Sequence, residues 1–344
     1  MKFKDIEFGF KSAEAERKID PDLLLDGFFH KGDIINEICN GVPYFILGYK
    51  GSGKSSIAEH LSLLSTTDPT LFVNLCALRD FPFEQVPEVI SATGDKTVRT
   101  NLGWSILLVL KIFESISEDN EARRENPEID SLASKLRKLG LLPKRKLRDL
   151  VLVSREIDLS LALPKALTAS MKDTYKEPVL VLSQVRDVIM EMVIVTRTTN
   201  QHILFLDGLD EIFYKFEDSY FSLASLVHEV DALNSDFSNA GVPIKVVLLC
   251  RTDVFERLPS PNINKLRDFT ITLVLLIGII ARINISNPNY SLWPPSERLI
   301  LDTLVRMSSM ISFPENLNVA VAIIWIPTNF YSITLAILPE ISCK

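Results

Sequence analysis

The chain has few cysteines and no pattern that would join them. Its 344 residues include four, Cys39, Cys76, Cys250 and Cys343, which are widely separated, with no C-x-x-C pair and no His/Cys cluster. This spacing indicates neither a zinc site nor a disulfide framework. Because isolated cysteines are usual in a reducing compartment, we expect a cytoplasmic protein.

An excess of positive charge and an apolar leader are also lacking. The net charge is −7 and the sequence pI is about 5.3, so no global field attracts nucleic acid or an anionic membrane. Residues 1–18 are rich in charge and lack the apolar stretch of a signal peptide. Since 47% of the residues are apolar, the chain can form a large core and about two domains.

Glycine is scarce as well, with 13 residues, yet three of them lie between positions 48 and 53. The segment GYKGSGKS, from Gly48 to Ser55, fits the pattern G-x-x-x-x-G-K-[ST] without a mismatch. An apolar run from Tyr44 to Leu47 precedes it and predicts a strand, and a helix is expected from Ser55 to about Leu64. A strand, a loop and a helix in this order are the setting that a phosphate-binding loop requires, which disfavours a chance glycine loop.

Each part of this loop has a physical role in holding a triphosphate. Glycines let the backbone approach the phosphates, so that several N–H groups can point at one anion, and the helix N-terminus adds partial positive charge. We expect Lys54 to reach the β- and γ-phosphates and Ser55 to take one Mg²⁺ position. The predicted nucleotide contacts are Gly48, Tyr49, Lys50, Gly51, Ser52, Gly53, Lys54, Ser55 and Ser56.

A second motif follows about 150 residues later, in QHILFLDGLDEI from Gln201 to Ile212. Its apolar run ends in Asp207, and an acid at the carboxyl end of a buried parallel strand lies where ligands bind. Asp207 is therefore expected to hold Mg²⁺, and Asp210 or Glu211 to orient the attacking water. The alternative is a core strand that enters an ordinary acidic turn.

A third apolar run, IKVVLLC from Ile244 to Cys250, predicts another buried strand and is followed by Arg251. Arg251 is the candidate for contact with the γ-phosphate, as the resemblance described below implies, and its alternative role is an ion pair with Asp253 or with an acid of the insertion. Further strands are expected at 70–75 and 269–273, and helices at 101–117, 179–198 and 219–233.

Residues 118–175 differ in character and predict a helical insertion. From Lys135 to Arg148 there are seven basic residues and no acid, which would suit nucleic acid or an acidic partner. No aromatic residue is interleaved with these charges, so we favour a solvated helical surface that pairs with the preceding acids.

These motifs together resemble the additional-strand P-loop ATPases near the STAND, NACHT and KAP groups. The segments FILGYKGSGKSSIA, LFLDGLDE and VVLLCRTDVFERL, within residues 6–268, are similar to a bacterial family of poorly characterised P-loop ATPases, some associated with phage defence. The resemblance implies an α/β fold of three layers, a mostly parallel sheet with helices on both faces. Many additional-strand ATPases have a glutamate directly after the aspartate, whereas this chain has Gly208. This departure leaves undecided which residue is the catalytic base.

Three segments are expected from the composition and the motifs together: a lead-in at 1–41 that packs on the core, a P-loop ATPase domain at 42–273, and an atypical apolar tail at 274–344. Residues 269–344 hold only eight charged residues. Residues 317–338 carry no charge and are long enough to span a bilayer, although no basic residue flanks their start. Other interpretations are a buried helical lid and a shift of reading frame near Asp268, which we favour because the resemblance ends there.

The expected function is ATP binding with Mg²⁺-dependent hydrolysis, in a switch or motor module that acts in defence or signalling. GTP is disfavoured because the nearest match to N-K-x-D has Arg267 where guanine recognition needs an acid. A non-hydrolysing, nucleotide-gated scaffold is the main alternative, and a small-molecule kinase ranks below it. The expected partners are a second copy of the chain or another protein. Membrane association is disfavoured, and residues 317–338 are the stretch through which it could occur.

Overall fold

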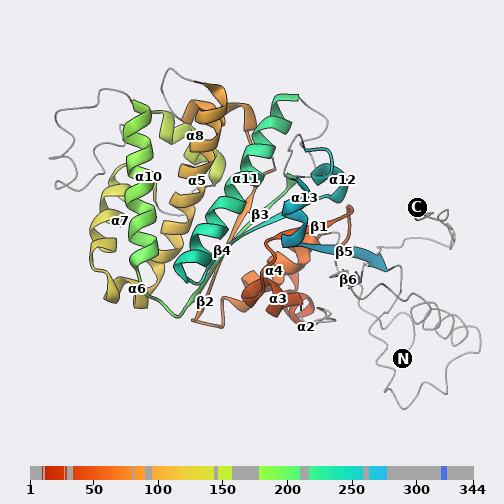
Figure 1. The fold of residues 1–344 in the computed structure, drawn as a ribbon. Helices are drawn as coiled ribbons and strands as arrows, with labels where there is room; N and C mark the ends of the chain where they lie inside the picture. The colour runs from red at the N-terminus through yellow and green to blue at the C-terminus, as the bar shows by residue number, and fades with distance from the viewer. Residues whose placement is uncertain are drawn as a thin grey trace, which may run out of the picture.

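The structure is a computed structural model that describes Phe10, Phe28 and residues 12–26, 34–79, 81–89, 95–142, 146–156, 178–209, 217–258, 263–276 and 319–323. Its centre is a six-stranded sheet with the order β2-β3-β4-β1-β5-β6, in which every pairing is parallel (Figure 1). The strands are β1 (Phe45–Gly48), β2 (Leu71–Ala77), β3 (Gln201–Asp207), β4 (Ile244–Cys250), β5 (Thr270–Leu276) and β6 (Val319–Ile323).

The central strands are buried on both faces, which explains their nearly continuous apolar sequences. Because successive side chains point to opposite faces, β4 divides its residues between two core clusters. Val246 and Leu248 belong to the larger cluster, whereas Val247 and Leu249 belong to the smaller one. The sheet therefore forms the middle layer of three, and the predicted α/β fold with a parallel sheet is confirmed.

The larger cluster lies under long helices that cover one face of the sheet (Figure 1). These helices are α5 (Lys96–Glu118), α10 (Pro178–Val195) and α11 (Glu217–Ala240). The 3₁₀-helix η2 (Phe83–Val89) and the helices α6 (Asn120–Glu125), α7 (Glu128–Lys138) and α8 (Leu147–Glu156) complete this layer. Trp104 of α5 is fully buried there and donates its indole N–H to the Ser222 carbonyl at 2.9 Å.

The smaller cluster lies under α3 (Ile34–Asn40) and α4 (Lys54–Leu64) on the other face. Two short helices, α1 (Ala13–Ile19) and α2 (Pro21–Asp26), contact α4 from outside. Arg17 of α1 pairs with Glu59 of α4 at 2.9 Å, and Phe28 stacks on His60 with ring centroids 4.0 Å apart. The described part of the expected lead-in thus lies against the helix that follows the glycine loop.

Strand β4 leads into α12 (Thr252–Phe255), and the chain then forms α13 (Ile263–Leu266) and the 3₁₀-helix η5 (Arg267–Phe269) before β5. Strand β5 continues to Leu276, beyond the expected end at 273. Within 317–338, the stretch considered as a membrane span, the structure places β6 beside β5. Among the described residues, no helix is long and apolar enough to cross a bilayer.

Candidate functional site

The carboxyl ends of three neighbouring strands bring the predicted site residues to one edge of the sheet. Leu47 pairs with Cys250, so Gly48 at the end of β1 lies beside Arg251 after β4. On the other side of β4, Leu206 pairs with Leu248, which brings Asp207 at the end of β3 to the same edge. This edge is where open parallel sheets bind their ligands.

Ser55 and Asp207 are in direct contact at this edge. The Ser55 hydroxyl, in the first turn of α4, donates a hydrogen bond of 2.6 Å to Oδ2 of Asp207. The other carboxylate oxygen, Oδ1, accepts the Gly208 N–H at 2.6 Å. These two bonds fix the orientation of the carboxylate toward the start of α4.

The ammonium group of Lys54 lies inside the glycine loop. Lys54 is only 6% exposed, and its Nζ donates to the carbonyl oxygens of Gly48 at 2.9 Å and Tyr49 at 3.1 Å. A buried cation in contact with a curved backbone is suited to binding an anion.

The glycines of the loop are required by its geometry. Gly51 and Gly53 have φ values of 84° and 88°, in the region that side chains disfavour. At Gly48, an added Cβ would lie 2.3 Å from Oγ of Ser52 and 3.1 Å from the Leu273 carbonyl oxygen. The loop is therefore a close backbone turn with no room for a side chain at its start.

Two features leave this loop able to accept a phosphate group. Ser52 is 1% exposed, yet its hydroxyl has no hydrogen-bond partner in the part of the chain that the structure describes. Helix α4 begins at Lys54 without a side-chain cap at Gly53, so its N-terminal N–H groups lack the acceptor that most helices supply. An orphaned hydroxyl and an uncapped helix start beside a buried lysine fit a triphosphate. The remaining predicted contacts lie at the rim: Tyr49, Lys50 and Gly51 are exposed and Ser56 is half-buried.

A small residue is also required directly after Asp207. Gly208 has φ of 92°, and an added Cβ would lie 2.9 Å from the backbone nitrogen of Arg79, two residues after the end of β2. An acidic side chain cannot occupy this position without moving the backbone. The predicted catalytic acids, Asp210 and Glu211, lie outside the described residues.

Arg251 is paired with Asp253, the alternative that the sequence left open. Its guanidinium donates from Nε to Oδ1 at 2.9 Å and from Nη2 to Oδ2 at 2.7 Å. These hydrogen bonds lower the pKa of Asp253, although partial burial acts in the opposite direction. Asp253 therefore remains charged at neutral pH.

The donor set of this edge suits a magnesium ion that is shared with phosphate. Among the described residues, no group of three or more His, Cys, Asp or Glu side chains is placed so that it could hold a metal ion. Mg²⁺ needs no such group, because it is usually held by one or two carboxylates, waters and the phosphates of its substrate. Ser55 and Asp207 supply a hydroxyl and a carboxylate for that arrangement.

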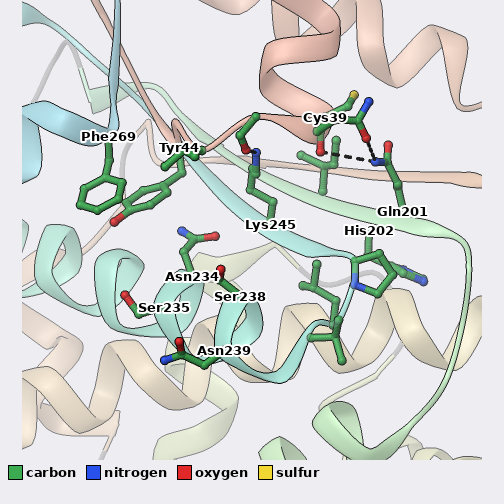
Figure 2. Close-up of a pocket in the computed structure, with 17 residues that line it drawn as sticks. Cys39, Tyr44, Gln201, His202, Asn234, Ser235, Ser238, Asn239, Lys245 and Phe269 are labelled. Carbon is green, nitrogen blue, oxygen red and sulfur yellow. Dashed lines mark hydrogen bonds between the residues drawn. The ribbon is translucent and has the colours of Figure 1, made fainter.

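A pocket of about 480 Å³ lies at the opposite, amino edge of the sheet (Figure 2). Its lining includes Lys245, Gln201 and Asn234 but no residue of the glycine loop. Lys245 donates to the carbonyl oxygens of Ile38 and Gly41, both at 2.6 Å, and Asn234 bonds both backbone groups of Val246. These polar groups are thus already used to hold α3 and α11 to the sheet. We therefore place the candidate site at the carboxyl edge instead.

The backbone of Arg79 is the part of the site that the sequence did not identify. It closes on Gly208 because β2 pairs with β3 along its whole length, ending at Ala77 beside Asp207. No local pattern in the sequence marks such an approach.

Comparisons of this chain with family models, curated proteins and solved structures find no match.

Proposed function

We propose that the chain binds ATP at the carboxyl edge of its sheet, with Mg²⁺ held between Ser55 and Asp207. The observation that carries this proposal is the 2.6 Å hydrogen bond between these two side chains, where the glycine loop ends and α4 begins. The sheet order adds support, because β4 lies between the strand before the loop and the strand that ends in Asp207. A strand inserted at this position is expected of the additional-strand P-loop ATPases that the sequence resembles.

The residues of the loop have separate tasks in this proposal. Lys54 supplies positive charge from a buried position, and the hydroxyl of Ser52 supplies a hydrogen bond that no protein group uses among the described residues. Ser55 and Asp207 orient the metal ion, which neutralises phosphate charge when it is bound. Binding in this way stabilises charge by position, which is the main contribution of proteins to phosphoryl transfer.

Hydrolysis requires an additional group that positions a water molecule, and Asp210 and Glu211 are the candidates from the sequence. If one of them acts so, the protein is an ATPase that works as a switch or motor module, together with a second copy or another protein. If neither does, ATP holds a scaffold in one conformation without turnover. Gly208 favours this second function, because its geometry excludes an acid at the position next to Asp207.

Lys54→Ala provides the test of nucleotide binding. Equilibrium binding of labelled ATP in the presence of Mg²⁺ should be lost in this variant, because a buried cation is removed from the phosphate site. Lys265→Ala, at an exposed lysine of α13, is the matched control and should bind as the wild type does. Retention of ATP by a folded Lys54→Ala protein would refute the proposal.

The rate of phosphate release distinguishes an ATPase from a non-hydrolysing scaffold. Asp210→Asn and Glu211→Gln should each leave ATP binding intact, and the variant that removes the water-positioning acid should slow phosphate release by about 100-fold or more. In a scaffold, the wild type itself would release phosphate no faster than buffer, and neither substitution would change the rate.

A further inference from the structure

The ion pair between Arg251 and Asp253 follows directly after β4, the strand that pairs with the strand before the glycine loop. Both hydrogen bonds of the pair are short, and the side chains are 23% and 35% exposed. Arg251 follows Cys250, which pairs with Leu47, and Gly48 follows Leu47. Adjacent parallel strands are about 4.8 Å apart, so the backbone of Arg251 lies next to the backbone where the loop begins.

The backbone of Arg251 is therefore within an arginine side chain's length of the loop, and its guanidinium is engaged by a carboxylate of its own segment. Asp253 accepts both N–H groups on one edge of the guanidinium, in the geometry that arginine also uses for phosphate. Carboxylate and phosphate oxygens compete for the same donors, so this edge of the guanidinium can serve only one of them at a time.

We propose that Asp253 is a positioning residue that retains Arg251 in the nucleotide-free protein, and that the γ-phosphate of ATP displaces Asp253 from Arg251. This inference rests on the proposed function. Asp253 then affects how the protein discriminates ATP from ADP. Because ADP lacks the γ-phosphate, Asp253 weakens the binding of ATP and leaves the binding of ADP unchanged.

The strength of the pair suits such an exchange. A partly exposed ion pair contributes little net free energy, so releasing it should weaken ATP binding by about twofold to fivefold rather than prevent it. The hydrogen bonds from Arg251 keep the pKa of Asp253 below its usual value. The carboxylate is thus charged, and the competition operates, throughout the neutral pH range.

The test compares dissociation constants of ATP and ADP by calorimetry in the full chain. Asp253→Asn should bind ATP about twofold to fivefold more tightly than the wild type and bind ADP equally well. Arg251→Ala should lose about tenfold in ATP affinity with little change for ADP, because it removes a charged donor to phosphate. Adding Asp253→Asn to Arg251→Ala should then have no effect, since nothing remains for Asp253 to retain.

Asp130→Asn is the matched control, because Asp130 also accepts two hydrogen bonds from one arginine, Arg123, but on α6 and α7. It should change neither dissociation constant. If Asp253→Asn leaves the affinity for ATP unchanged, or shifts the affinities for ATP and ADP equally, the inference is overturned. Loss of ATP binding in Lys54→Ala would still support the proposed function. A wild type that binds neither nucleotide would instead overturn the proposed function itself.

Discussion

The hydroxyl of Ser55 donates a hydrogen bond to the carboxylate of Asp207 although the two residues are 152 positions apart in the chain. Ser55 lies in the first turn of the helix that follows β1, and Asp207 is the last residue of β3. One strand, β4, separates β1 from β3, so the parallel register of three strands produces this contact. The sheet itself thus brings the carboxylate that we propose as a ligand of Mg²⁺ to the end of the glycine loop.

Removing the charge of Asp207 should weaken the contribution of Mg²⁺ to ATP binding. Asp207→Asn keeps the size of the side chain but provides a poorer ligand to a hard cation, so the increase in ATP affinity on adding Mg²⁺ should fall by about tenfold or more. The measurement is ATP binding with Mg²⁺ and with EDTA. In EDTA the variant and the wild type should agree, and a variant that keeps the full Mg²⁺ effect would contradict the assignment of Asp207.

The close approach of Gly208 to Arg79 predicts a difference between two glycine substitutions. Gly208→Ala adds a Cβ at a positive φ and 2.9 Å from a backbone nitrogen, whereas Gly241→Ala adds one at a φ of 65° with nothing within 4 Å. Both variants incur the strain of a left-handed alanine, about 1 kcal/mol. Gly208→Ala should lower the free energy of unfolding by about 1–2 kcal/mol more than Gly241→Ala does, because the backbone at Arg79 or Gly208 must move to make room.

Denaturant unfolding of the two glycine variants measures this difference. Equal losses of stability would show that β2 and β3 can separate at this point at no cost. In that case an acidic residue after Asp207 would be tolerated, and the geometric reason for the scaffold function would disappear.

The sequence predicted the sheet well because its central strands are buried on both faces. An apolar run such as IKVVLLC is typical of a parallel strand between two layers, and β4 has the predicted bounds, Ile244–Cys250. Helix α5 was predicted from Asn101 but begins at Lys96, since Asp95 caps it by accepting the Thr97 N–H. Its first residues, 96–99, are not buried, so they carry no apolar pattern that would mark them as helix.

The site was predictable to the extent that it follows from single segments. The loop at Gly48–Ser55 and the aspartate after an apolar run are local patterns, and the structure brings Ser55 and Asp207 together. The Arg251–Asp253 pair could be named only as one of two options, because sequence does not rank competing partners. The approach of Arg79 to Gly208 depends on the pairing of distant strands, which no local pattern encodes.

At the amino edge, Lys245 should stabilise the fold by capping α3. Lys245→Met removes both hydrogen bonds to the carbonyl oxygens of Ile38 and Gly41 and should lower the free energy of unfolding by about 1–3 kcal/mol at pH 7. Burial lowers the pKa of Lys245 to about 8, below its usual value near 10.4. Between these values the unfolded chain binds more protons, so Lys245 makes stability rise with pH in this window.

The difference in unfolding free energy between the wild type and Lys245→Met isolates this contribution from other groups that titrate above pH 8. The difference should increase from pH 8 to pH 10. A difference that stays constant over this range would show that the ammonium group keeps an ordinary pKa in the folded protein.

Asp119 should contribute a pH-dependent part of the stability at the acid end. This buried carboxylate caps α6 through the Glu121 N–H and accepts hydrogen bonds from Thr198, Asn200 at 2.8 Å and His202 at 3.2 Å. Burial alone would raise the pKa of Asp119, but these donors outweigh it and lower the pKa well below its usual value. The charged form is thus more stable in the folded protein than in the unfolded chain.

The sign of the effect follows from this lowered pKa. Above about pH 4, where the unfolded aspartate is ionised, the full contribution is present, and it declines as the pH falls toward the lower pKa of the folded state. Asp119→Asn should therefore reduce the free energy of unfolding by about 3 kcal/mol at pH 7, since it leaves a buried network with one partner removed. The deficit relative to the wild type should shrink when unfolding is measured at pH 3.

Asp130→Asn, at an exposed ion pair, is the control and should lower the free energy of unfolding by less than about 1 kcal/mol. If Asp119→Asn instead shows the same deficit at both values of pH, the carboxylate does not carry its charge into the buried network.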